Sequence, residues 1–280
     1  MIRTYSPLRY PGGKGKLIKY FKELFTENDL HQGTYVELYA GGAAVALSLL
    51  IDGYASKIII NDDDRSISAF WYSVLNYTED LCEMIRKTPV NMTTWKKQKE
   101  IQKNKKEVGI LDLGFSTLFL NRTNRSGILS AGVIGGNKQK GKWKINARYD
   151  KETLINKIRL IASYKHKIEL YSHDAIHVIK EIIPKLPIKT LIYLDPPYYH
   201  KGKQLYMNYY IDKDHEEVAE TIRKTYIQKW IITYDEADLI KKVYSGEKMI
   251  PYSLKYSAGK NKEGKELMIF SKNLIALNPF

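Results

Sequence analysis

The tetrapeptide Asp195-Pro196-Pro197-Tyr198 places a carboxylate, two rigid prolines and an aromatic ring in succession. It directly follows the run from Leu191 to Leu194, which is short, apolar and ended by proline, so we expect a buried strand with Asp195 at its carboxyl end. Prolines offer carbonyl acceptors without N–H donors, and the tyrosine offers a ring face for stacking. These groups could hold a flat ring that bears an amino group. By itself, the tetrapeptide is equally compatible with an ordinary strand-ending turn.

A glycine loop after an earlier predicted strand is a second candidate site. The run Glu37-Leu38-Tyr39-Ala40-Gly41-Gly42 ends a strand and opens a helix, and Asp62 follows the next strand, where an acid can hold ribose hydroxyls. The loop lacks the full Gly-x-Gly-x-x-Gly pattern, so a pyrophosphate ligand is poorly supported. A cofactor with a ribose, no phosphate and a cationic group, such as S-adenosylmethionine, fits better. The alternative for the glycines is a plain turn between strand and helix.

Composition narrows the class of protein and its partners. The 280 residues are 44% hydrophobic, enough for one large domain or for one domain with a smaller insertion. The 45 Lys and Arg residues against 31 Asp and Glu give a formal charge of +14, which favours a polyanionic partner such as nucleic acid. The single cysteine, Cys82, excludes an intrachain disulfide and a cysteine-built zinc site, and no cluster of His, Cys and carboxylates predicts any other metal.

The chain shows no targeting or membrane segment. Its N-terminal part has no apolar stretch typical of a secretory signal. The longest weakly polar run, Leu38 to Ile51, is shorter than the roughly 20 apolar residues that span a bilayer. We therefore expect a soluble cytoplasmic protein without a membrane partner.

Strand and helix patterns alternate at both ends of the chain, which predicts an α/β fold built on a mostly parallel sheet. The expected strands are residues 34–39, 57–60, 167–171, 190–194 and 229–233, with a closing pair near 252–256 and 266–270. Between residues 75 and 165 the composition changes, and Asn121 to Tyr149 is rich in Gly, Asn, Arg and Lys. We expect a catalytic and cofactor-binding domain of residues 1–75 and 165–280. A smaller, mainly helical domain of residues 76–164 would be inserted into it.

Several motifs, in order, resemble one enzyme family. Leu8-Arg9-Tyr10-Pro11-Gly12-Gly13-Lys14 is similar to an N-terminal cofactor segment, and the glycine loop and Asp62 occupy the positions expected after it. Phe119-Leu120-Asn121-Arg122 is similar to the start of a recognition element, and Asp195-Pro196-Pro197-Tyr198 to a catalytic tetrapeptide. Together they resemble the Dam-like N6-adenine-specific DNA methyltransferases, the D12 class with alpha-type motif order. The likeness extends over nearly the whole chain and implies a Rossmann-like S-adenosylmethionine-dependent fold with an inserted recognition domain.

The resemblance assigns roles to individual positions. The catalytic residues would be Asp195, Pro196, Pro197 and Tyr198. The cofactor-binding residues would be Tyr10, Gly13, Lys14, Glu37, Tyr39, Gly41, Asp62, Asp174 and Asp195. Among these, Asp174 would read the cofactor's adenine, although Ala175 stands where the family usually has an aromatic residue.

The inserted region supplies candidates for DNA contact. Arg122, Asn124 and Arg125 can make bidentate contacts with base edges, and each could equally bind phosphate. If Asn137 to Lys144 is extended, the ammonium groups of Lys138, Lys140, Lys142 and Lys144 lie on one face that could follow phosphates. An exposed, solvated loop is the alternative for that segment. The sequence Thr123-Asn124-Arg125-Ser126-Gly127 departs from the best-known members, so recognition of GATC does not follow from the resemblance.

The implied reaction is transfer of a methyl group from S-adenosylmethionine to N6 of an adenine flipped out of double-stranded DNA. We expect a monomer, and the sequence leaves open whether a cognate restriction endonuclease is its partner. Three other hypotheses stay open: a methyltransferase acting on RNA or on a protein amide, a catalytically silent DNA-binding homologue, and, more remotely, a nicotinamide-dependent oxidoreductase.

Overall fold

A mostly parallel sheet forms the centre of the molecule. The computed structural model describes residues 4–9, 14–199, 210–225, 228–256 and 262–279, and in this part of the chain the sheet has seven strands in the order β3-β2-β1-β4-β5-β7-β6. The strands are β1 (Gly33–Glu37), β2 (Ala55–Asn61), β3 (Ile168–Tyr171), β4 (Thr190–Leu194), β5 (Lys229–Asp235), β6 (Lys248–Tyr256) and β7 (Lys262–Phe270). Strands β1 to β5 pair in parallel, whereas β7 is antiparallel to both β5 and β6. The predicted α/β sheet with a closing pair of strands is confirmed.

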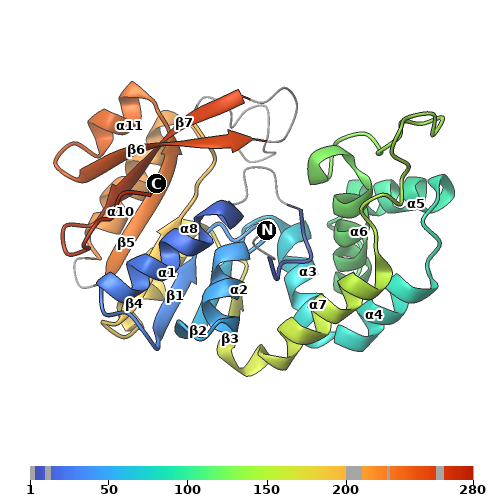
Figure 1. Cartoon of the computed structure of the whole chain (residues 1–280), viewed down its shortest axis with the longest axis horizontal. Helices are drawn as coiled ribbons and strands as arrows, with labels where there is room; N and C mark the ends of the chain where they lie inside the picture. Colours follow the sequence, from blue (N-terminus) through green and yellow to red (C-terminus); the bar gives the residue numbers. More distant parts are fainter. Residues whose placement is uncertain (1–3, 10–13, 200–209, 226–227, 257–261, 280) are drawn as a thin grey trace.

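Helices cover both faces of this sheet because its central strands are apolar on both sides. In β1 all five residues are buried, and Tyr35 belongs to one hydrophobic core while its neighbour Val36 belongs to the other. The first core contains α1 (Ile18–Glu27), α2 (Ala44–Ile51) and α3 (Arg65–Asn76). The second contains α8 (Ala175–Glu181), α10 (Asp212–Arg223) and α11 (Asp238–Val243). The result is a layer of strands between two layers of helices (Figure 1).

The chain changes direction across the sheet between β1 and β4. From β1 it proceeds outward through β2 to β3, and it then returns to the other side of β1 to form β4 and β5. The carboxyl ends of these parallel strands lie at one edge of the sheet. In open α/β sheets the crevice beside such a reversal is where ligands bind.

A helical lobe packs beside the sheet, on the right in Figure 1. It consists of α4 (Thr78–Lys87), α5 (Met92–Lys103), α6 (Ile110–Thr123) and α7 (Lys151–Ser163). Helix α6 lies close against α3, since a Cβ atom at Gly114 would come within 2.7 Å of the carbonyl oxygen of Ala69. Residues 76–164 are mainly helical, with a long connection from Asn124 to Asp150, and their role as a separate inserted domain stays a prediction.

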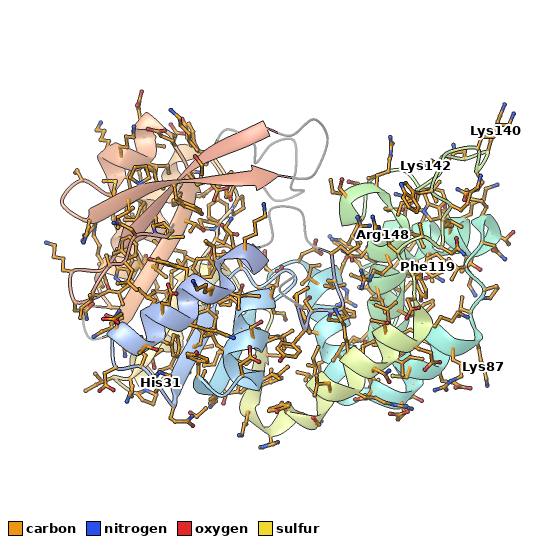
Figure 2. All side chains as sticks on the ribbon, viewed as in Figure 1. His31, Lys87, Phe119, Lys140, Lys142 and Arg148 are labelled. Carbon is orange, nitrogen blue, oxygen red and sulfur yellow. The ribbon has the colours of Figure 1, made fainter. Side chains whose placement is uncertain are left out.

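Part of that connection differs from the expectation. The segment from Asn137 to Lys144 is not extended but consists of turns and bends, and Gly135, Gly136 and Gln139 adopt positive φ angles of 86°, 74° and 49°. The period-two argument for its lysines is therefore wrong, because side chains alternate between faces only along a strand. The four lysines are nevertheless exposed, and Figure 2 shows Lys140 and Lys142 at the outer end of the helical lobe.

The remaining regular elements are short 3-10 turns. They are η1 (Lys14–Leu17), η2 (Arg125–Gly127), η3 (Lys165–Lys167) and η4 (Ile183–Lys185). Among the described residues, no helix combines the length and the apolar character needed to cross a membrane.

Candidate active site

A cavity of about 390 Å³ opens at the carboxyl ends of the parallel strands. Acidic residues from four consecutive strand ends line it: Glu37 from β1, Asp62 after β2, Asp174 after β3 and Asp195 after β4. The sheet thus brings together carboxylates that are far apart in the sequence. The volume of the cavity is within the range of pockets that hold a small molecule or cofactor.

The glycine loop forms one wall of this cavity. Gly41 adopts a φ of 45° and donates its N–H to Oδ2 of Asp62 at 2.8 Å, while its carbonyl accepts a hydrogen bond from the indole of Trp71. Gly42 and Ala43 line the cavity, and Ala43 is in the left-handed region at the start of α2. Gly41 therefore fixes the loop from behind, and its neighbours present their backbone to the cavity.

The pKa values of two carboxyl groups that line the cavity, Glu37 and Asp62, are shifted far from their usual range. Burial raises the pKa of Glu37 to about 8, against the opposing effect of an N–H from Ala46, and the nearby Asp195 and Asp62 raise it further. Burial likewise raises the pKa of Asp62 to about 7, although the N–H groups of Gly41 and Asp64 oppose the shift. Crowded, poorly hydrated carboxyl groups favour a cationic ligand, whose charge would stabilise their ionised forms.

Asp195 is oriented by contacts to only one of its two oxygens. Oδ1 lies 3.0 Å from the ammonium nitrogen of Lys14 and accepts a hydrogen bond of 2.7 Å from the hydroxyl of Thr233 on β5. No described residue donates to Oδ2 or to the carbonyl oxygen of Pro196. Asp195 and Pro197 line the cavity, whereas Pro196 between them is buried and does not line it.

The ring of Tyr198 was expected to offer an open face for stacking, but in the structure it is buried. Its side chain is 6% exposed, and its hydroxyl donates to Oε1 of Glu266 at 2.7 Å while accepting from Lys14. The ammonium of Lys14 also lies 4.9 Å from the centre of the tyrosine ring. A stacking role for Tyr198 thus stays a prediction that requires the ring to become accessible.

The other predicted cofactor residues divide into three groups. Lys14, Tyr39 and Asp174 line the cavity. The hydroxyl of Tyr39 shares a 2.9 Å hydrogen bond with that of Tyr210, and Asp174 accepts from the N–H of Ile176 at the start of α8. Gly41 lies behind the wall, as described above. Tyr10 and Gly13 fall outside the described residues.

Arg122 extends from the helical lobe toward the same cavity. It lines the cavity together with Arg9, and each guanidinium has a buried nitrogen without a hydrogen-bond partner. Burial lowers the pKa of Arg122 to about 10, and the positive charge of Arg9 lowers it further. Two desolvated like charges without described acceptors indicate a site for an anion or for acceptor atoms of a bound molecule.

The two neighbouring candidates behave unlike Arg122. Asn124 is fully buried, where it accepts from the indole of Trp95 at 2.7 Å and donates to the carbonyl oxygens of Ile128 and Leu129. Its amide is engaged in folding the connection, so the structure does not support a base-reading role for it. Arg125, by contrast, is exposed.

Sequence reasoning missed Thr233, Glu266, Tyr252 and Arg9 as members of the site. Glu266 was recognisable in principle, because an acid at the start of the apolar run Leu267 to Phe270 is unusual for a buried strand. Thr233 offered no local signal. Its importance comes from β4 and β5 being neighbours, which sets its hydroxyl beside Asp195.

A family model and a curated relative both describe methyltransferases. The family model described as D12 class N6 adenine-specific DNA methyltransferase matches residues 10–258. The type II methyltransferase M.MjaIII of Methanocaldococcus jannaschii is 23% identical over 205 residues, which are 68% of this chain and 68% of that protein. Solved structures with similar folds include the rRNA methyltransferase aviRa of Streptomyces viridochromogenes, at 7% identity and a TM-score of 0.38 over 92% of this chain and 86% of that chain. TrmN of Thermus thermophilus has 10% identity and a TM-score of 0.41 over 89% of this chain and 47% of that chain.

Proposed function

This chain belongs to the D12 class of N6 adenine-specific DNA methyltransferases, and from that premise we propose that it methylates N6 of an adenine flipped out of duplex DNA at a short specific site. The observation that carries the proposal is that Asp195 lines the cavity while no described residue donates to its Oδ2. The carbonyl oxygen of the next residue, Pro196, likewise accepts from no described donor. A planar amino group has two hydrogens, and this pair can accept both of them.

The residues of the cavity fit S-adenosylmethionine as the methyl donor. When bound, that molecule supplies a methyl group on a positively charged sulfur. Asp195 lies at the strand ends, where it would provide negative charge for such a cation, and the cation would in turn favour the ionised form of Glu37. Asp62 provides acceptor oxygens for ribose hydroxyls. Asp174 stands at the exposed rim, where we expect the adenine ring of the cofactor.

Asp195 would act by orienting the target rather than by forming a bond to it. The lone pair of an adenine amino group is delocalised into the ring, which makes the nitrogen a weak nucleophile. Hydrogen bonds to Oδ2 of Asp195 and to the Pro196 carbonyl favour a pyramidal nitrogen with its lone pair aimed at the methyl group. As N6 gains the methyl group and the methyl–sulfur bond of the donor breaks, N6 must lose one proton, and we expect Oδ2 of Asp195 to accept it.

We expect the helical lobe to bind the DNA. Arg122 and Arg9 would contact the DNA near the flipped nucleotide, because their guanidinium groups line the cavity and have unpaired nitrogens. Arg125 and the exposed lysines of the connection would contact bases or phosphates farther out. In this division of labour residues 76–164 form the recognition domain, and residues 1–75 and 165–280 perform catalysis.

We also propose the wider setting of the enzyme. The relative from Methanocaldococcus jannaschii is a type II methyltransferase, so a restriction endonuclease directed at the same unmodified site is the expected partner. We expect the methyltransferase itself to act as a monomer.

The test is transfer of labelled methyl groups to matched substrates. Purified protein is incubated with labelled S-adenosylmethionine and with duplex DNA, RNA or peptide, and the modified base is identified by mass spectrometry. We expect N6-methyladenine in duplex DNA alone. Transfer only to RNA or to a peptide amide would select the other substrate classes, and cofactor binding without transfer to any substrate would indicate a silent homologue.

Two variants then test whether Asp195 is required for methyl transfer. Asp195→Ala should abolish transfer, and it should weaken cofactor binding without abolishing it, because Glu37, Asp62 and Asp174 still line the cavity. Asp29→Asn is the matched control, because Asp29 is 96% exposed and its φ of 52° is one that asparagine adopts readily. Full transfer by Asp195→Ala would contradict the proposal.

A further inference from the structure

A carboxylate is buried in the closing strand pair, directly behind the catalytic tetrapeptide. Glu266 on β7 is 1% exposed, and both of its oxygens are engaged. Oε1 accepts the hydrogen bond from the hydroxyl of Tyr198 at 2.7 Å, and Oε2 accepts one from the hydroxyl of Tyr252 on β6. The ammonium nitrogen of Lys14 lies 3.6 Å from Oε2. Glu266 therefore joins three elements that are remote in the sequence.

These contacts form one continuous chain of donors and acceptors. Lys14 donates to the hydroxyl of Tyr198, which donates to Glu266, while the same ammonium group also pairs with Asp195. A single ammonium charge is thus shared between two carboxylates, at 3.0 Å from Asp195 and 3.6 Å from Glu266. The position of Lys14 between the two acids depends on both of them.

We propose that Glu266 is a positioning residue for methyl transfer, which sets the placement of Tyr198 and Lys14 and, through Lys14, the charge that Asp195 presents to the substrate amino group. The inference rests on the proposed function and adds a residue that the tetrapeptide does not contain. Without the negative charge of Glu266, Lys14 would be drawn to Asp195 alone, which weakens Asp195 as an acceptor. The Tyr198 hydroxyl would at the same time lose its charged acceptor.

Stability alone does not account for this carboxylate. Removing two or three charged groups from water is unfavourable, and an apolar replacement of a buried ion pair is often neutral or stabilising. Burial raises the pKa of Glu266, with Asp195 adding to the shift, while Lys14 and the two tyrosine hydroxyls oppose it. A buried acid that is paired with a lysine and two hydroxyls beside Asp195 is typical of a functional network.

The experiment is a double-variant cycle on the full-length protein with duplex DNA. Glu266→Gln, Tyr198→Phe and the double variant are compared with the wild type for kcat, KM for DNA and the dissociation constant of S-adenosylmethionine. Glu266→Gln keeps the size of the side chain and removes its charge. The control is Glu23→Gln, since Glu23 lies on α1 with a side chain that is 52% exposed.

We expect Glu266→Gln to lower kcat by about tenfold to a hundredfold, the range for losing a hydrogen bond to a charged group, with the cofactor dissociation constant changed less than about threefold. The double variant should be no slower than the slower single variant, because both changes interrupt the same chain. A double variant whose losses multiply would show that Glu266 does not act through Tyr198, and an unchanged kcat in Glu266→Gln would equally overturn the inference.

If Glu266→Gln does not fold, Tyr252→Phe tests the same inference. It removes the other donor to Glu266 and leaves the carboxylate in place, so a reduced kcat at an unchanged melting temperature supports the inference and a wild-type kcat contradicts it. A wild-type protein without DNA methylation would instead refute the proposed function and with it this inference. An active wild type with unchanged variants would refute the inference alone.

Discussion

Thr233 holds Asp195 through a single oxygen: its hydroxyl donates a 2.7 Å hydrogen bond to Oδ1, the atom that also faces Lys14. Thr233 itself shares a 2.8 Å hydrogen bond with the hydroxyl of Tyr193, which is buried in β4. This arrangement fixes the rotation of the carboxylate and keeps Oδ2 free. The orientation of Asp195 thus depends on the neighbouring strand β5 as well as on Lys14.

The first prediction concerns that orientation. Thr233→Val keeps the shape of the side chain and removes the hydroxyl, so Asp195 keeps only Lys14 to fix its Oδ1. We expect kcat to fall by about tenfold, and the free energy of unfolding to fall by about 1–3 kcal/mol because the Tyr193 hydroxyl becomes unpaired. Steady-state kinetics and urea unfolding check both values. Thr233→Ser, which restores the hydroxyl, should recover most of kcat, and equal losses in both variants would argue against an orienting role.

The second prediction is a pH dependence that comes from Glu37. Its pKa is raised from 4.5 to about 8 in the folded protein, so between these values the unfolded chain has released a proton that the folded chain still binds. The free energy of unfolding must therefore fall as pH rises through this window, by at most about 1.4 kcal/mol per pH unit from this group. Glu37→Gln should lack that contribution.

The measurement is the difference in unfolding free energy between wild type and Glu37→Gln, taken by urea denaturation at several pH values from 5 to 8. The wild type should lose stability relative to the variant as pH rises. Glu23→Gln, which replaces an exposed acid on α1, is measured alongside as the control for removing a carboxyl group. A pH-independent difference for Glu37→Gln would show that Glu37 ionises normally.

The third prediction separates stability from binding at Arg122. Its guanidinium is desolvated beside Arg9 and has an unpaired nitrogen, so Arg122→Met should raise the free energy of unfolding of the free protein by up to about 1 kcal/mol. The same change should weaken DNA binding by about tenfold, within the 1–3 kcal/mol of a good base contact. Urea unfolding and fluorescence anisotropy with labelled duplex DNA measure the two effects. Arg159→Met is the control, since Arg159 is exposed and pairs with Glu79.

The fourth prediction concerns salt. Replacing the exposed lysines of the connection by glutamine should weaken DNA binding without preference for sequence, and should flatten the plot of log K against log salt by about 0.9 for each phosphate that is no longer neutralised. The replaced residues are Lys138, Lys140, Lys142 and Lys144. A control with as many exposed lysines elsewhere uses Lys19, Lys87, Lys180 and Lys241. If the salt dependence of DNA binding has the same slope in the two variants, the connection is a solvated loop that does not contact phosphates.

The strands of the sheet could be predicted from the sequence because each one is a short apolar run with its own boundaries. The run Thr190 to Leu194 is apolar and ended by proline, and β4 has those bounds. The prediction that the lysine-rich segment is extended was wrong because its glycines allow turns that the alternation of lysines does not reveal. The base-reading role expected for Asn124 is not supported because its side chain bonds Trp95, which lies in another helix. Thr233 could not be predicted because its role comes from a neighbour that only the folded sheet supplies. Glu266 stands out as an acid beside an apolar run, but its partners Lys14 and Tyr198 are revealed only by the fold.

Asn121 connects the helical lobe to the N-terminal segment. Its side chain accepts from the N–H of Arg9 at 2.7 Å and donates to the carbonyl of Arg9 at 2.8 Å, as a neighbouring β-strand would. A few residues later the same segment supplies Lys14 to Asp195. An exchange of target specificity between relatives should therefore transplant this N-terminal segment together with residues 76–164, because a chimera that moves the helices alone would break the junction at Arg9 and misplace the lysine.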